Sequence, residues 1–89
     1  MNTPTMNRPI LLLSRPDCQL CDEFLEELTH AFPDLAASVQ TTDVDSRDDW
    51  RERYGSRIPV LLDGDGVVLG EGVFDAEALA ARLGGRAQG

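Results

Sequence analysis

The chain has 89 residues, enough for one domain with a single hydrophobic core and too few for two. Its 42% hydrophobic and 27% charged residues are ordinary for a globular protein, and no apolar run is long enough to span a membrane or form a secretory signal, so we expect a cytoplasmic protein. Sixteen acidic against eight basic residues give a net charge of −8, which argues against nucleic acid and anionic membranes as partners.

The ends of the chain differ in composition from its middle. Residues 1–8 contain Thr, Asn and Pro and are predicted to be a flexible N-terminal segment. Gly84-Gly85 predicts the end of the last helix, so residues 85–89 are expected to form a flexible tail. Residues 9–84 would then be the folded domain. Its first element, Ile10 to Ser14, is an unbroken apolar run typical of a central strand buried on both faces.

Two cysteines, Cys18 and Cys21, follow this strand and open an amphipathic helix that cannot pass about Ala31, because Pro33 disfavours helical geometry in the residue before it. The apolar residues after Cys21 recur at helical spacing and place Cys21 on the buried stripe, with Cys18 off it. Free N–H groups and the positive end of the helix dipole would favour a Cys18 thiolate. The spacing therefore predicts a nucleophile, Cys18, and a resolving thiol, Cys21. The alternative is that both cysteines are simply small, buried hydrophobic residues without a redox role.

The remaining elements complete a βαβα order followed by ββα. Val39 to Val44 predicts a parallel edge strand, and a short helix capped by Asp45-Ser46 would close at Gly55. Residues 59–62 and 67–69 flank two Asp-Gly pairs, which predicts a β-hairpin. Asp75 can cap a final helix.

This order, with the Cys-x-x-Cys at the first helix, resembles the thioredoxin superfamily, and the length resembles a glutaredoxin over residues 9–84. The resemblance implies an α/β, thioredoxin-like (glutaredoxin-like) fold, βαβαββα, with a four-stranded mixed sheet flanked by helices. Ile58-Pro59 matches the family's cis-proline dipeptide, and its backbone would pair with an extended substrate. Arg15 matches the basic residue that meets a glutathione carboxylate.

The resemblance implies a set of substrate-binding residues around the cysteines: Arg15, Leu20, Arg57, Ile58, Pro59, Gly72 and Asp75. Three positions depart from the glutaredoxin pattern. Leu20 replaces an aromatic residue, Glu71 adds a negative charge, and Phe74 replaces a polar side chain. Glutathione is therefore a weakly supported reductant. The nearest likeness is to small glutaredoxin-like bacterial proteins with unassigned substrates.

We expect an enzyme, a monomeric thiol-disulfide oxidoreductase that acts on a protein or small-molecule disulfide, with no bound cofactor and no metal. Asp17 and Asp22 oppose a Cys18 thiolate while Arg15 and Arg57 favour it, so we expect a moderately activated thiol and a reductant. One alternative is a binding module without turnover that holds a partner peptide in a groove beside Pro59. Another is a metal or iron–sulfur protein, although one cysteine pair supplies only two of the usual four ligands.

Overall fold

The computed structural model describes residues 9–88, with side chains described as far as residue 84. Its elements in chain order are β1 (Ile10–Ser14), α1 (Gln19–Ala31), α2 (Pro33–Ala37), β2 (Val39–Asp43), the 3-10 turn η2 (Val44–Ser46), α3 (Asp48–Tyr54), β3 (Val60–Leu62), β4 (Val68–Glu71) and α4 (Ala76–Gln88). The strands form one mixed sheet in the order β2-β1-β3-β4. The α/β class and the four-stranded mixed sheet are thus confirmed.

Strand β1 lies inside the sheet, as its apolar sequence predicts. It pairs in parallel with β2, from Ile10 opposite Val39 to Ser14 opposite Asp43, and antiparallel with β3, with Leu13 opposite Val60. Successive side chains of a strand point to opposite faces, so Leu12 points to one side of the sheet and Leu11 and Leu13 point to the other. Leu12 and Leu13 are both almost fully buried.

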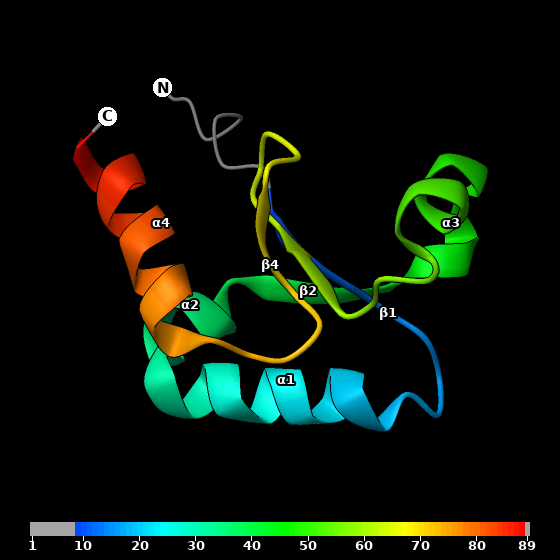
Figure 1. Cartoon of the computed structure of the whole chain (residues 1–89), viewed down its shortest axis with the longest axis horizontal. Helices are drawn as coiled ribbons and strands as arrows, with labels where there is room; N and C mark the ends of the chain where they lie inside the picture. The colour runs from blue at the N-terminus through cyan, green and yellow to red at the C-terminus, as the bar shows by residue number, and fades with distance from the viewer. Residues whose placement is uncertain (1–8, 89) are drawn as a thin grey trace.

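Helices cover both faces of the sheet and create two cores (Figure 1). On the face covered by α1 and α4 the buried residues are Leu12, Phe24, Leu28, Leu61, Leu69 and Leu79. On the face covered by α3 they are Leu13, Val44, Tyr54, Val60 and Leu62. The alternation of Leu12 with Leu13, and of Leu61 with its neighbours in β3, is what a sheet buried on both sides requires.

Helix α1 ends at Ala31, as Pro33 predicts, and its cap residue Phe32 donates its N–H to the Leu28 carbonyl. Helix α2, which no sequence pattern predicted, begins directly at Pro33. Proline suits the first turn of a helix, where its missing N–H would have no partner in any case. One proline therefore ends α1 and starts α2.

The second predicted helix begins later than expected. Asp43, rather than Asp45, is the acceptor at this point of the chain: its Oδ1 accepts the Asp45 N–H at 2.8 Å and starts η2. The regular helix α3 follows from Asp48 and closes at Gly55, as predicted. The Asp45 carboxylate is consequently available for another role.

The hairpin and the cap of the last helix are confirmed, and the end of that helix is not. Strands β3 and β4 are antiparallel, and Asp75 Oδ1 accepts the Ala78 N–H at 3.1 Å. Helix α4 continues through Gly84-Gly85 to Gln88, so a helix end at the glycines was wrong. Each glycine costs a helix about 1 kcal/mol relative to alanine and no proline follows, so the helix can continue. Residues 1–8 and Gly89, also expected to be flexible, lie outside the described residues.

Candidate functional site

The cysteine pair follows β1, at the end of the sheet where this central strand stops. Residues 15–18, here called the redox loop, lead from β1 to α1, and within them Asp17 has a positive φ of 65°. Cys18 is the N-cap of α1, with its sulfur accepting the Cys21 N–H at 3.1 Å and its carbonyl accepting the Asp22 N–H at 3.1 Å. One N–H of the first turn of α1, that of Cys21, therefore points at the Cys18 sulfur, in line with the position of the motif at the helix start.

Cys18 and Cys21 form a disulfide, with their Cα atoms 5.2 Å apart. Cys21 is 3% exposed and belongs to the buried face of α1. Cys18 is partly exposed. The expected difference between an accessible and a sheltered sulfur is therefore present, and the pair is close enough to switch between dithiol and disulfide.

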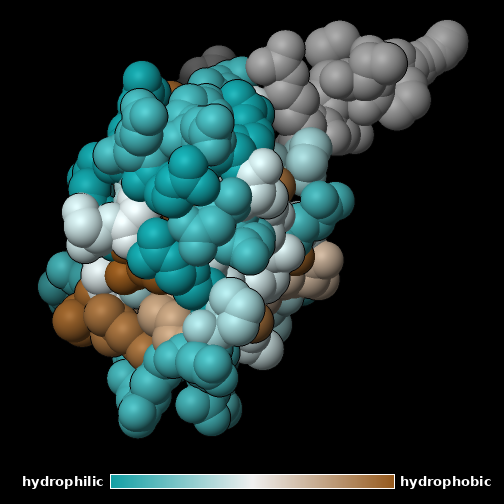
Figure 2. Space-filling view, turned by 90° about the vertical axis from the view of Figure 1, so that its right-hand side faces the viewer, coloured by the Kyte–Doolittle hydropathy of each residue, from teal (hydrophilic) through white to brown (hydrophobic). Residues whose placement is uncertain are grey.

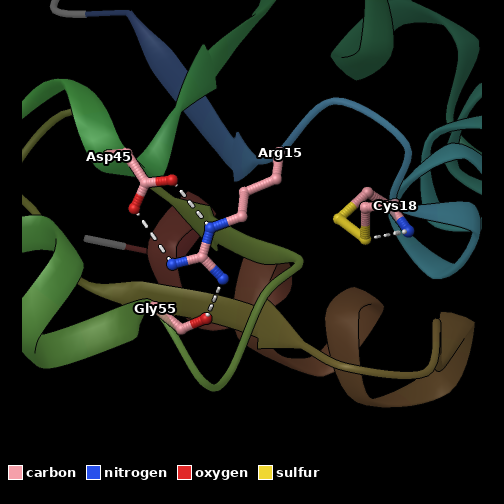
Figure 3. Close-up of a disulfide and its surroundings, with 5 residues drawn as sticks. Arg15, Cys18, Asp45 and Gly55 are labelled. Atoms are coloured by element: carbon pink, nitrogen blue, oxygen red, sulfur yellow. Dashed lines mark hydrogen bonds and ion pairs between the residues drawn. A yellow bond between two sulfur atoms is a disulfide. The ribbon is translucent and has the colours of Figure 1, made fainter.

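Arg15 is the best-anchored side chain of the redox loop, and its guanidinium points away from the sulfurs (Figure 3). Its Nε and Nη2 donate to the two carboxylate oxygens of Asp45 at 2.8 and 3.0 Å, and its Nη1 donates to the Gly55 carbonyl at 2.9 Å. The hydrogen bond with Arg15 lowers the pKa of Asp45, and the same bond raises the pKa of Arg15. Arg15, which was expected to bind a carboxylate of the substrate, is thus already bound to the carboxylate of Asp45.

Arg57 is engaged in the same way. Its Nε donates to Glu71 Oε2 at 3.0 Å, its Nη2 donates to Glu71 Oε1, and its guanidinium carbon lies 5.4 Å from the centre of the Tyr54 ring. The hydrogen bond with Arg57 lowers the pKa of Glu71. Neither this pair nor Arg15–Asp45 has a local sequence signal, because the partners lie 14 and 30 positions apart.

Pro59 and Gly72 meet at this end of the sheet. The Ile58-Pro59 peptide bond is cis, Pro59 is buried, and its carbonyl accepts the Gly72 N–H at 2.8 Å. Gly72 has φ 69°, a left-handed conformation that glycine adopts without steric cost. Among residues 9–88, no hydrogen bond to the backbone of Ile58 is found. The register between β1 and β3 ends with Leu13 opposite Val60, so Pro59, directly before Val60, lies at the end of β1 that leads into the redox loop.

The other two expected binding residues differ in exposure and role. Leu20 is 38% exposed in the first turn of α1. Asp75 is occupied as the N-cap of α4. Val73, which was not among the expected binding residues, is 73% exposed in the segment after β4. Figure 2 views the end of the molecule where α3 and the start of α1 lie, and shows an apolar patch low on this face among hydrophilic side chains.

A groove of about 310 Å³ runs beside the redox loop. It is lined by Ser14, Arg15, Pro16, Asp17, Asp22, Thr41, Thr42 and Asp43. Three of these residues are acidic, and the one basic residue is the Arg15 that is already paired. The surroundings of the cysteines are therefore negatively charged.

Within the described residues, no group of three or more His, Cys, Asp or Glu side chains could hold a metal ion. None of the helices in residues 9–88 is long and apolar enough to cross a membrane.

Comparison with known proteins agrees with this geometry. The glutaredoxin-like domain family (DUF836) matches residues 9–84. A crystal structure of a structural genomics target protein from X. campestris is 34% identical, with a TM-score of 0.69 over 85% of this chain and 96% of that one. A solution structure of a Nitrosomonas europaea protein is 22% identical and shares the fold, with a TM-score of 0.72 over 92% of this chain and 98% of that one. No curated protein matches. The fold is thus glutaredoxin-like, and the chain belongs to the glutaredoxin-like domain family.

Proposed function

We propose that the protein is a thiol-disulfide oxidoreductase in which Cys18 is the nucleophile and Cys21 the resolving thiol. The observation that carries this proposal is the placement of Cys18 as the N-cap of α1, where its sulfur accepts the Cys21 N–H. In the dithiol form the same donor would stabilise the Cys18 thiolate.

The reaction follows from the two positions. The Cys18 thiolate attacks one sulfur of a substrate disulfide, forming a mixed disulfide and releasing the other sulfur as a thiolate that takes a proton. Cys21 then loses its proton and attacks the Cys18 sulfur, which expels the second substrate thiol and leaves the Cys18–Cys21 disulfide. Two electrons pass from protein to substrate, and an external thiol or dithiol returns them. The bonded pair is the oxidised state of this cycle.

The surroundings favour a reductant over a strong oxidant. The arginines that could add positive charge near Cys18, Arg15 and Arg57, are each neutralised by a carboxylate. The thiolate would therefore depend on the helix N–H groups alone, while the exposed Asp17 and Asp22 oppose it. A less stabilised thiolate makes the dithiol form the better electron donor. Equilibration with a glutathione redox buffer tests this, and a potential near that of strongly oxidising dithiol proteins contradicts it.

We further propose a disulfide in a protein or small molecule as the substrate, a monomer as the working form, and the cytoplasm as the compartment. The backbone of Ile58, beside the buried Pro59, is the proposed point where an extended substrate segment pairs with the protein. The low thiol potential of the cytoplasm suits a dithiol that is repeatedly reduced.

Single cysteine variants test the proposal. We expect Cys18→Ser to abolish dithiothreitol-dependent reduction of insulin disulfides, because no nucleophile remains at the helix start. Cys21→Ser should instead accumulate a mixed disulfide on Cys18, visible by intact-protein mass spectrometry. Equal activity of the two variants would contradict the assignment of roles. Partner binding that survives loss of both sulfurs, without turnover in the unmodified protein, would favour the binding module.

A further inference from the structure

We infer that the site discriminates by charge: it disfavours thiols and disulfides that carry a carboxylate near the sulfur, glutathione among them, and favours neutral or cationic ones, with Asp45 and Glu71 setting this preference. The inference rests on the proposed thiol-disulfide exchange and concerns which partners take part in it.

The first reason is that both arginines at this end of the sheet are satisfied within the chain. Arg15 and Arg57 each hold a carboxylate through two nitrogens, and Arg15 spends its remaining terminal nitrogen on the Gly55 carbonyl. A two-nitrogen pair of this kind matches the geometry of guanidinium and carboxylate. A substrate carboxylate would have to displace Asp45 or Glu71, which exchanges one pair for another and leaves a displaced anion beside it.

The second reason is that these pairs lie at the same end of the sheet as the cysteines. Ser14, which precedes the redox loop, is opposite Asp43 of β2, and Leu13 is opposite Val60 of β3. Val60 is in turn opposite Glu71 of β4. Asp45 and Glu71 therefore lie at the same end of the sheet as the redox loop, on the two sides of β1, and cancel the charges of the arginines that could attract an anion.

The third reason is the charge that remains after pairing. Asp17 and Asp22 are exposed on either side of the cysteine pair and have no basic partner among the described side chains. Two like charges about 10 Å apart in water lower the rate of encounter about twofold, and charges closer together lower it more. A thiol with one negative charge and a thiol with one positive charge should therefore differ on the order of tenfold at low ionic strength, and less at high salt.

The experiment measures how fast small monothiols reduce the Cys18–Cys21 disulfide. Cysteamine, 2-mercaptoethanol and 3-mercaptopropionate carry positive, zero and negative charge beside the thiol, and glutathione is added as a fourth. Each rate is corrected for the thiol pKa and divided by its rate with an uncharged small disulfide, which removes intrinsic nucleophilicity. We expect cysteamine fastest and 3-mercaptopropionate slowest, with the difference shrinking in high salt.

Two variants and one matched control locate the cause. Asp45→Asn and Glu71→Gln free the charge of one arginine each and should raise the 3-mercaptopropionate and glutathione rates several-fold, with 2-mercaptoethanol changing less than twofold. Asp49→Asn is the control, because Asp49 holds Arg47 through two nitrogens at 3.0 and 2.8 Å within the α3 region. It removes the same formal charge and the same kind of pair, and should change the anionic rates less than the other two variants do.

The outcomes separate this inference from the proposed function. Rates that do not depend on thiol charge, or an Asp49→Asn effect equal to that of Asp45→Asn, would overturn the charge discrimination while dithiothreitol still supports insulin reduction. Absence of insulin reduction with dithiothreitol, a neutral dithiol, would overturn the oxidoreductase itself.

Discussion

Replacing Gly72 with alanine probes the contact between the segment after β4 and Pro59. Gly72 has φ 69°, and a Cβ added there would meet no atom within 4 Å. The cost is therefore conformational: the left-handed region costs an L-residue about 1–2 kcal/mol, from which the lower entropy of the unfolded alanine chain recovers about 0.4–1 kcal/mol. We expect Gly72→Ala to lower the free energy of unfolding by about 1 kcal/mol.

Gly66 offers a matched control. It lies in the turn between β3 and β4, has φ 84°, and is equally free of neighbours around an added Cβ. Gly66→Ala should therefore lose about the same stability. In a domain of 60 to 100 residues, 1 kcal/mol corresponds to about 4–8 °C in Tm, which circular dichroism resolves easily. Both variants should melt lower by about this amount.

The two variants should differ in activity. The Gly72 N–H donates to the Pro59 carbonyl, so a shift of residue 72 moves the strand start beside the redox loop. Small displacements of groups that position a substrate reduce rates strongly, and we expect Gly72→Ala to slow insulin reduction on the order of tenfold, measured at 25 °C where both variants are folded. An unchanged Tm for Gly72→Ala, or equal activity losses in the two variants, would refute this reasoning.

Three further predictions concern stability. Phe24→Ala should cost about 3–5 kcal/mol in urea unfolding, because Phe24 is 2% exposed and its ring lies 5.3 Å, edge to face, from that of Phe74. Asp75→Ala should cost about 1 kcal/mol, also measured in urea, because the first turn of α4 loses its cap; a loss near zero would mean that water replaces the carboxylate. The pKa of Asp45 is below its ordinary 3.8 through the hydrogen bond with Arg15, so the stability that this pair adds is complete above pH 3.8 and disappears as the pH falls through the lower folded value. The Tm difference between the unmodified protein and Asp45→Asn should follow that course, and a difference independent of pH would contradict it.

Much of the fold could be predicted because its signals are local. The apolar run from Ile10, the helical spacing after Cys21 and the Asp-Gly pairs between β3 and β4 each depend on neighbouring residues, and each matches the structure. Local signals also misled where two structures were compatible with them. Gly84 suits both a helix end and a helix interior at modest cost, and the chain continues the helix there.

The cysteine positions could be predicted and the state of the arginines could not. Cys18 and Cys21 obey the same local spacing as the helix that carries them. The partner of Arg15 was out of reach because Asp45 looks like a helix cap in sequence, and only the fold brings it to the redox loop. Because Asp43 is the acceptor that starts η2, the Asp45 carboxylate is free to pair with Arg15.

The Arg15 guanidinium joins three separate stretches of chain at one point: the redox loop, η2 through Asp45 and the end of α3 through Gly55. None of these stretches belongs to the sheet, and each would open easily alone. Joined in this way, they should open together, so their amide protons would exchange with solvent as one cooperative unit. The mobility of Cys18 would then depend on α3, which covers the face of the sheet opposite to α1. In Arg15→Gln, hydrogen exchange would resolve that unit into segments with different protection.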